Sequence, residues 1–447
     1  MINKHNTAAA FNREFRNWRI WATRGLVVAA AAAAGLAVTG FTWLGEQALS
    51  LFMQAFRFKP WLTLLWTPLC TAAIVWVTRR HFSAAAGSGI PQVMAALDPL
   101  APPHATSRLV SFRLSMAKLG LTTWGLLAGL SLGREGPSVQ VAAGIMLTVR
   151  RWLPERSSVS THGLLVAGGA AGIAAAFNTP LAGVMFAIEE LSRTPEQRSS
   201  GLLMSAIVLA GLIAVSVYGN ATYFGIIRTS GIDLSLLLPG ALVALTSGLA
   251  GGLFSRLLQA SLSGHAADAL SRLRRSRPVL FAALCGLMVA VIGMVSAGAT
   301  FGSGYSHTRD MVAGRESVPA LFLLLKFVAT WLTTWSGVPA GIFAPSLAIG
   351  AALGNDIAQL LHSPQATALI ALGMVGFLAA ATQAPLTSFI IVMEMVDGHS
   401  MVLSLMACAM VARTVSHVIS APLYPVLARQ QLANATVLAG PHGGGPL

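Results

Sequence analysis

The sequence predicts an all-α, polytopic membrane protein that is built from two repeated halves of tilted and broken helices. The first observation is composition, because 55% of the 447 residues are hydrophobic and only 10% are charged, against about 25% charged in soluble proteins. The second is a series of uncharged apolar stretches, among them 25–45, 60–78, 199–227, 234–255 and 327–355. The third is a set of glycine and proline breaks that recurs in both halves. Soluble enzymes, disordered proteins and disulfide scaffolds are excluded.

The positive charge of the chain indicates its orientation in a membrane. The formal net charge is +14, and a basic excess can also indicate nucleic-acid binding. Here the arginines flank apolar stretches, as Arg79 and Arg80 do, and four more lie within 272–277. Positively charged loops stay in the cytoplasm. We therefore expect no nucleic-acid partner and a cytoplasmic location for the N-terminus, the 79–80 loop and the 256–277 loop.

The chain divides into a membrane domain and two short ends. Residues 1–24 are basic and predict a cytoplasmic N-terminal helix. Residues 25–433 form the membrane domain, with a first half at 25–227 and a second half at 234–433. Residues 434–447 end in a glycine-rich run and predict a flexible tail.

Several apolar stretches are interrupted by glycine and proline, at 87–91, 133–137, 178–180, 302–304, 337–345 and 384–385. A break inside hydrocarbon leaves backbone N–H and C=O groups unpaired. It is tolerated only where protein or a hydrated cavity receives those groups. The breaks therefore predict a pathway through the membrane.

An internal repeat relates the breaks of the two halves. Residues 174–190 (AAAFNTPLAGVMFAIEE) align with 379–394 (AAATQAPLTSFIIVME) at an offset of 205. The pair Pro137–Ser138 aligns with Pro345–Ser346 at 208, and the GSG at 87–89 aligns with that at 302–304 at 215. Matching broken segments in two halves are typical of a transporter site near the bilayer midplane. The alignment leaves open whether the halves are inverted.

Two of the breaks carry side chains that suit an anion site. The first is Gly87-Ser88-Gly89-Ile90-Pro91, where free N–H groups at a helix start and the Ser88 hydroxyl could attract an anion. A simple Ser/Gly helix cap is the alternative. The second is Gly133-Arg134-Glu135-Gly136-Pro137, where Glu135 lies between apolar segments. An acid at membrane depth is a functional candidate, with pairing to Arg134 at a helix start as the alternative.

The remaining candidates lie in later segments. The break from Gly337 to Pro345 has no charge, so its chemistry would come from backbone amides at Ile342 and Phe343, or it is only a kink. Glu189 aligns with Glu394 and suggests structure, whereas Glu190 aligns with Met395. Glu190 is therefore a functional candidate, with a helix-end charge as the alternative.

Two further patterns have simpler interpretations. Tyr424 by itself predicts an interfacial anchor. The match of Gly129-Leu130-Ser131-Leu132-Gly133 to a hydrolase GxSxG elbow lacks the strand–turn–helix setting that the elbow needs. Zinc-protease, P-loop and dinucleotide motifs are absent from the sequence. We expect no metal, no cofactor and no enzyme activity.

Together these segments resemble the CLC family of chloride channels and chloride/proton exchangers. GSGIP (87–91), GREGP (133–137) and GIFAP (341–345) look like the three selectivity-filter signatures of that family, in order and at fitting spacings. The resemblance extends over about 25–433 and includes AAFNTPLAGVMFAIEE (175–190) and PLY (422–424). It implies an inverted repeat, a homodimer within membrane lipid and a prokaryotic-type chain without CBS domains, placed in a bacterial inner membrane. The implied filter comprises Gly87, Ser88, Gly89, Ile90, Pro91, Gly133, Arg134, Glu135, Gly136, Pro137, Gly341, Ile342, Phe343, Ala344 and Pro345.

The resemblance also implies roles for single residues. Ser88 and Tyr424 would give hydroxyls, and Ile342 and Phe343 backbone N–H groups, to a central chloride. Glu135 looks like the external gating glutamate and Glu190 like the internal proton-transfer glutamate of exchangers.

Three further positions refine this comparison. Lys118 resembles a buried family lysine. Ser88 favours chloride, because nitrate-preferring plant relatives tend to carry proline there. Met94 departs from exchangers that place a glutamate at that position.

The expected function is H⁺/Cl⁻ antiport. Hydroxyls, amides and partial helix charges stabilise a dehydrated anion without trapping it. Glu135 would compete with chloride and take up a proton when chloride occupies the site, and Glu190 would relay that proton to the cytoplasm. A passive chloride channel is the first alternative, because a channel needs no internal proton acceptor. An intramembrane hydrolase using Ser131 is the remote alternative.

Overall fold

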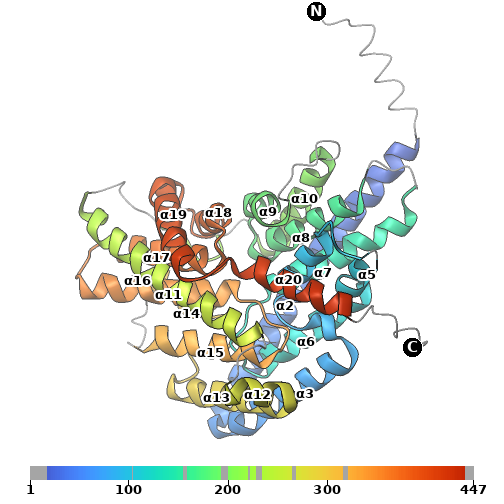
Figure 1. The fold of residues 1–447 in the computed structure, drawn as a ribbon. Coiled ribbons are helices and arrows are strands. Elements are labelled where there is room, and N and C mark those ends of the chain that lie inside the picture. Colours follow the sequence, from blue (N-terminus) through green and yellow to red (C-terminus); the bar gives the residue numbers. More distant parts are fainter. Residues whose placement is uncertain are drawn as a thin grey trace, which may run out of the picture.

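The computed structural model describes residues 18–102, 104–154, 159–192, 200–219, 222–227, 234–263, 268–315 and 321–437. Most of the predicted N-terminal segment (1–17) and of the predicted tail (438–447) lies outside these ranges. The described residues form helices that cross one another at many angles (Figure 1). The first-half helices are α2 (Trp18–Phe58), α3 (Thr63–His81), α4 (Ile90–Leu97), α5 (Ala105–Leu109), α6 (Phe112–Leu127), α7 (Glu135–Thr148), α8 (Thr161–Phe177), α9 (Pro180–Phe186) and α10 (Ser200–Tyr218). The second-half helices are α11 (Leu237–Ser263), α12 (Ala269–Ser276), α13 (Pro278–Val295), α14 (Tyr305–Val312), α15 (Phe322–Ser336), α16 (Phe343–Leu360), α17 (Ala366–Thr382), α18 (Pro385–Met395), α19 (Val402–Ile419) and α20 (Leu423–Val437).

The prediction of an all-α polytopic membrane protein with broken helices is confirmed. Five of the described helices are long and apolar enough to cross a membrane: Trp21–Phe58, Pro60–His81, Leu237–Ser263, Pro278–Val295 and His399–Ile419. Others, such as α9 and α18, have 7 and 11 residues, whereas a crossing needs about 20. Within the described ranges, the one extended pairing is an isolated antiparallel bridge between Gly133 and Gly341.

The ends of the membrane domain are continuous with its helices. Helix α2 begins at Trp18 and runs without interruption through residues 24 and 25. Helix α20 continues to Val437, past the predicted domain end at 433. The described parts of the predicted N-terminal helix and tail are therefore extensions of the first and last helices.

The repeated breaks have the same backbone geometry in both halves. Helix α8 ends at Asn178 with φ 59°, and helix α17 ends at its repeat equivalent Gln383 with φ 62°. Pro180 and Pro385 then start α9 and α18 in the first helical position, where proline is favoured because the missing N–H would be unpaired anyway.

Close contacts between neighbouring helices build the core. A Cβ atom on Gly172 of α8 would collide with the backbone of Ser138 in α7. In the second half, a Cβ atom on Gly350 of α16 would collide with the Gly373 carbonyl of α17. Small residues allow membrane helices to approach closely, so these glycines let α8 pack tightly on α7 and α16 pack tightly on α17. Helices α7 and α16 both begin at predicted filter segments.

The two ends of α3 distinguish two sides of the molecule. The short turn Lys59–Leu62 joins the end of α2 to the beginning of α3. We call the side at the end of α3 the Arg79 side, because Arg79 is in the last turn of α3. The opposite side, at the turn, is called the Lys59 side.

Candidate functional site: a buried anion pathway

Backbone hydrogen bonds join the three filter-like segments to one another. The Gly87 N–H donates to the Val338 carbonyl at 3.2 Å, and the Ala340 N–H donates to the Gly87 carbonyl at 3.2 Å. Gly133 and Gly341 exchange two hydrogen bonds of 2.8 and 2.9 Å. Segments that lie far apart in the sequence therefore form one continuous unit, as the resemblance to a filter implies.

Ser88 belongs to the first of these segments, and Tyr424 approaches it from near the C-terminal end of the chain. Both line a cavity of about 270 Å³ that Ile342 and, on the Arg79 side, Arg79 and Arg274 also line. Their hydroxyl oxygens are buried and have no hydrogen-bond partner among the described residues. The Tyr424 hydroxyl lies close to that of Ser88 without meeting hydrogen-bond geometry. Two unused donors in one buried cavity are suited to an anion.

One of the simpler interpretations is wrong, and another holds in part. Tyr424 is 0% exposed, and its ring stacks on Phe343 with centroids 6.0 Å apart, so it is not an interfacial anchor. The Ser/Gly segment does cap α4, but the cap is Gly89, whose N–H donates to the Gln92 side chain at 3.0 Å, and not Ser88. The Ser88 hydroxyl is thereby left available to the cavity.

The beginnings of α4 and α16 lie at the cavity, which Ser88, Pro91 and Ile342 line. Helix α16 begins at Phe343 after Ile342, and its first N–H groups have no acceptor within the helix. Such groups carry partial positive charge and favour anions. The amides of Ile342 and Phe343 therefore lie at a helix start, and Ile342 lines the cavity.

Glu135 places its carboxylate at this same helix start. It is fully buried, and one carboxylate oxygen accepts a hydrogen bond from the Ala344 N–H at 3.4 Å. The other oxygen, Oε1, has no partner among the described residues. A carboxylate thus occupies the kind of position that an anion would take at the beginning of α16.

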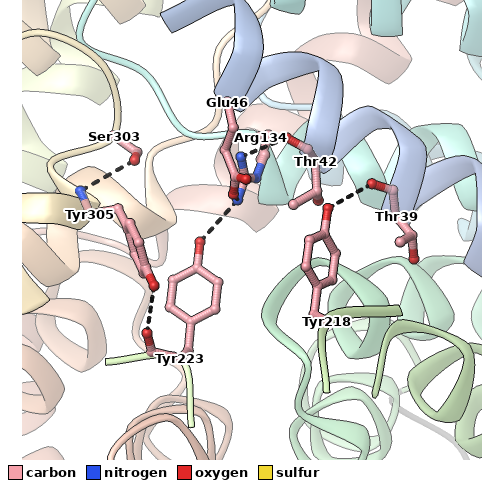
Figure 2. A network of polar contacts seen from close by, with 8 residues as sticks. All are labelled: Thr39, Thr42, Glu46, Arg134, Tyr218, Tyr223, Ser303 and Tyr305. Atoms are coloured by element: carbon pink, nitrogen blue, oxygen red, sulfur yellow. Dashed lines mark hydrogen bonds and ion pairs between the residues drawn. The ribbon is translucent and has the colours of Figure 1, made fainter. Parts of the chain in front are cut away.

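Arg134 does not pair with its neighbour Glu135 in the described chain. Its guanidinium donates instead to Glu46 Oε1 at 2.8 Å, to the Thr42 carbonyl at 3.0 Å and to the Tyr223 hydroxyl at 3.2 Å (Figure 2). The alternative in which Glu135 is only the ion-pair partner of Arg134 is therefore wrong. Glu46 and Tyr223 could not be predicted from the sequence as partners of Arg134, because no spacing rule connects them to residue 134.

Two buried lysines hold equivalent loops in the two halves. Lys118 donates to the carbonyls of Ala85 and Gly87 at 2.7 and 2.6 Å. Lys326 donates to the carbonyls of Thr300 and Gly302 at 2.9 and 2.7 Å. Lys326 was missed in the sequence, although its offset of 208 from Lys118 matches that of the two Pro–Ser pairs. Lys118 thus fixes the loop that precedes Ser88.

Glu189 and Glu190 lie in the π-helical turn η4 (Ala187–Leu191) that follows α9. The Glu189 carboxylate accepts hydrogen bonds from Leu386 and Thr387 N–H groups at the start of α18, which agrees with the structural interpretation. Glu190 is buried. Single π-helical turns are frequent at functional sites.

The remaining candidates have packing roles. Ser131 is fully buried and shares a 2.9 Å hydrogen bond with the Thr330 hydroxyl. This contact holds two core segments together and leaves the serine without access to solvent. Met94 is partly buried and packs against the main hydrophobic core.

Comparisons with known proteins agree with the resemblance. Residues 70–417 match the family model described as voltage gated chloride channel. The H(+)/Cl(-) exchange transporter ClcA of Citrobacter koseri is 30% identical over 415 residues, which cover 88% of this chain and 84% of that protein. The ClcA of Klebsiella pneumoniae is 31% identical over 375 residues, covering 80% and 76%.

Solved structures share the fold. A slow cyanobacterial Cl-/H+ antiporter superposes with a TM-score of 0.79 at 24% identity, covering 92% of this chain and 98% of that one. A CLC-type fluoride/proton antiporter gives a TM-score of 0.75 at 21% identity, with coverage of 92% and 98%.

Proposed function

This chain belongs to the voltage gated chloride channel (CLC) family, and from that premise we propose that it is an H⁺/Cl⁻ antiporter. The relatives named as H(+)/Cl(-) exchange transporters, at 30 and 31% identity, support this function. The observation that carries the proposal is the position of Glu135. Its carboxylate lies at the first amides of α16, close to the cavity of Ser88 and Tyr424.

Chloride would be held by groups that carry no full charge. The hydroxyls of Ser88 and Tyr424 and the amides of Ile342 and Phe343 would replace part of its hydration shell. The buried amine of Lys118 is occupied by two carbonyls, and the guanidinium of Arg134 is occupied by Glu46. Chloride would thus bind without being trapped, which conduction requires.

Competition between chloride and Glu135 would couple the two ions. An ionised carboxylate and a chloride ion cannot share one buried anion site without strong repulsion. Arrival of chloride therefore favours protonation of Glu135, and the neutral side chain can leave the site. One protonation event then accompanies the movement of the anion.

Glu190 would accept the proton on the cytoplasmic side of the pathway. It is buried in η4, the turn that follows α9. A second acid is needed because Glu135 alone would have to carry the proton across a dry stretch, and acids inside membranes serve as proton relays.

The protein is an integral membrane protein, and we assign its orientation from its arginines. Arg79, Arg80 and the arginines of α12 would place the Arg79 side in the cytoplasm, together with the N-terminus. The Lys59 side would then be extracellular. The ClcA relatives support a location in a bacterial inner membrane. We also propose that the protein forms a homodimer surrounded by lipid.

Reconstitution in liposomes tests the function. A chloride gradient is imposed across vesicles that contain the purified protein, and the internal pH is followed. We expect protons to move against their own gradient while chloride moves down its gradient. Chloride flux without proton movement would instead establish a passive channel, and neither flux would contradict both functions.

A further inference from the structure

A second cavity, of about 230 Å³, lies on the Lys59 side. Its lining includes Glu46, Arg134, Ser303 and Tyr305. Glu46 belongs to the part of α2 that approaches the Lys59–Leu62 turn. Ser303 and Tyr305 come from the second half, so the cavity lies between the two halves of the chain.

The repeat relates this cavity to the one that contains Ser88. Ser303 is the equivalent of Ser88 at an offset of 215, and Arg134 is the equivalent of Ile342 at 208. Ser88 and Ile342 line the cavity on the Arg79 side, whereas Ser303 and Arg134 line the cavity on the Lys59 side. The two cavities are therefore counterparts that open toward opposite sides, and Arg134 replaces an uncharged residue in the second one.

The guanidinium of Arg134 is fixed by hydrogen bonds to Thr42, Glu46 and Tyr223. The Arg134 side chain is 9% exposed, whereas the side chain of its ion-pair partner Glu46 is 47% exposed. The Tyr223 hydroxyl accepts from the same nitrogen, and the Tyr223 carbonyl accepts from the Tyr305 hydroxyl at 2.9 Å (Figure 2). The tyrosine rings contact edge to face with centroids 4.6 Å apart. Arg134 is thus fixed in the wall, and Glu46 is its solvent-facing partner.

One donor of the guanidinium is still unused. Arg134 Nε is buried and has no hydrogen-bond partner among the described residues. The lining of the cavity therefore combines a fixed cation, Arg134, with one carboxylate, Glu46, that cancels much of the cation's field. Removing only the carboxylate's charge would leave a stronger anion site.

We propose that this cavity is the extracellular access chamber for chloride and that Glu46 sets its affinity by neutralising Arg134. The assignment rests on the proposed function for the identity of the ion and for the side of the membrane. The Glu46 carboxylate repels an arriving chloride. It also neutralises the Arg134 charge that would otherwise attract the chloride. Both effects weaken external binding, so chloride can leave again toward the extracellular side.

The test measures the sidedness of the chloride dependence. Glu46→Gln keeps an oxygen that can accept from Arg134 but removes the charge, Glu46→Asp keeps the charge, and both are compared with the wild type. Tyr218→Phe is the matched control, because the Tyr218 hydroxyl donates to the Thr39 carbonyl at 3.0 Å rather than contacting Arg134. Radioactive chloride exchange is measured in right-side-out and in inside-out membrane vesicles, with vesicles from non-expressing cells as background.

We expect Glu46→Gln to lower the half-saturating chloride concentration about fivefold in right-side-out vesicles only, the size expected for one unit charge several Å away in a partly hydrated site. Glu46→Asp and Tyr218→Phe should stay within about twofold of the wild type. A change below about twofold for Glu46→Gln, an equal change in both vesicle types, or the same change in Tyr218→Phe would overturn the proposal.

The experiment separates this inference from the proposed function. Chloride exchange requires no net proton movement, so the chamber can be tested even if the protein is a passive channel. An effect confined to inside-out vesicles would overturn the assignment of the chamber to the extracellular side. If the wild type shows no proton coupling but Glu46→Gln still lowers the half-saturating chloride concentration, the result would contradict the antiport function alone.

Discussion

Glu189 and Glu394 each cap a helix of the opposite half of the chain. Glu189, just after α9, accepts from Leu386 and Thr387 N–H groups at 3.0 and 2.6 Å. Glu394, near the end of α18, accepts from Leu181 and Ala182 N–H groups at 3.2 and 2.8 Å. The end of each helix thus meets the beginning of the other, so α9 and α18 run antiparallel. Because these helices are repeat equivalents, an approximate two-fold rotation relates the two halves at this contact.

We predict that neutralising either acid weakens this contact. A carboxylate that caps a helix start contributes about 1–2 kcal/mol through hydrogen bonds and the helix dipole. Glu189→Gln and Glu394→Gln should each lower the thermal unfolding temperature of the purified protein, by similar amounts because the contacts are equivalent. Ion selectivity should be unaffected. A loss of proton coupling in Glu189→Gln without loss of stability would contradict a purely structural role.

We predict that Glu135→Ala abolishes proton coupling and retains chloride flux. The variant removes the one carboxylate at the start of α16, so chloride no longer competes with an acid. The measurement is proton movement and chloride efflux in the same liposomes. Ser131→Ala serves as a control, because Ser131 is a core hydroxyl, and should be nearly silent. Continued uphill proton pumping by Glu135→Ala would show that the external proton site lies elsewhere.

Ser88→Pro is expected to shift the anion preference from chloride toward nitrate. The variant loses a hydroxyl that has no protein partner, and the proline ring reshapes the cavity wall. Competition between the two anions in flux assays measures the preference. Ser88→Ala separates the two causes, because it removes only the hydroxyl. An unaltered chloride-to-nitrate ratio in both variants would exclude a side-chain role for Ser88.

Glu190→Gln distinguishes the antiporter from the channel. Glutamine keeps the size and hydrogen-bonding capacity of the side chain but cannot exchange a proton. We expect proton transport to stop and chloride flux to stay within about tenfold, or about 1.4 kcal/mol in barrier height. If the variant loses both chloride flux and folding, Glu190 is structural. If the wild type moves no protons and the variant changes nothing, the channel function holds.

The sequence by itself determined the class of the protein and the segments of its pathway. Composition excludes a soluble fold, and the glycine and proline breaks mark helix ends because both residues act locally on the backbone. The alignment of Pro180 with Pro385 was enough to predict two equivalent breaks. Ser88, Glu135 and the amides after Gly341 lie within these glycine and proline breaks. They could therefore be selected as site candidates from the sequence.

Only the tertiary structure decided how these segments meet. A break at a proline looks the same whichever way its half is oriented, so the antiparallel arrangement of α9 and α18 became visible only in the contacts of Glu189 and Glu394. The partner of Arg134 was equally hidden, because its neighbour Glu135 is adjacent in sequence while Glu46 lies on a distant part of α2. Tyr424, which sequence reasoning alone assigns to an interface, is buried because α20 folds back against α4. Side-chain partners of this kind depend on which helices pack together, and no local pattern encodes that packing.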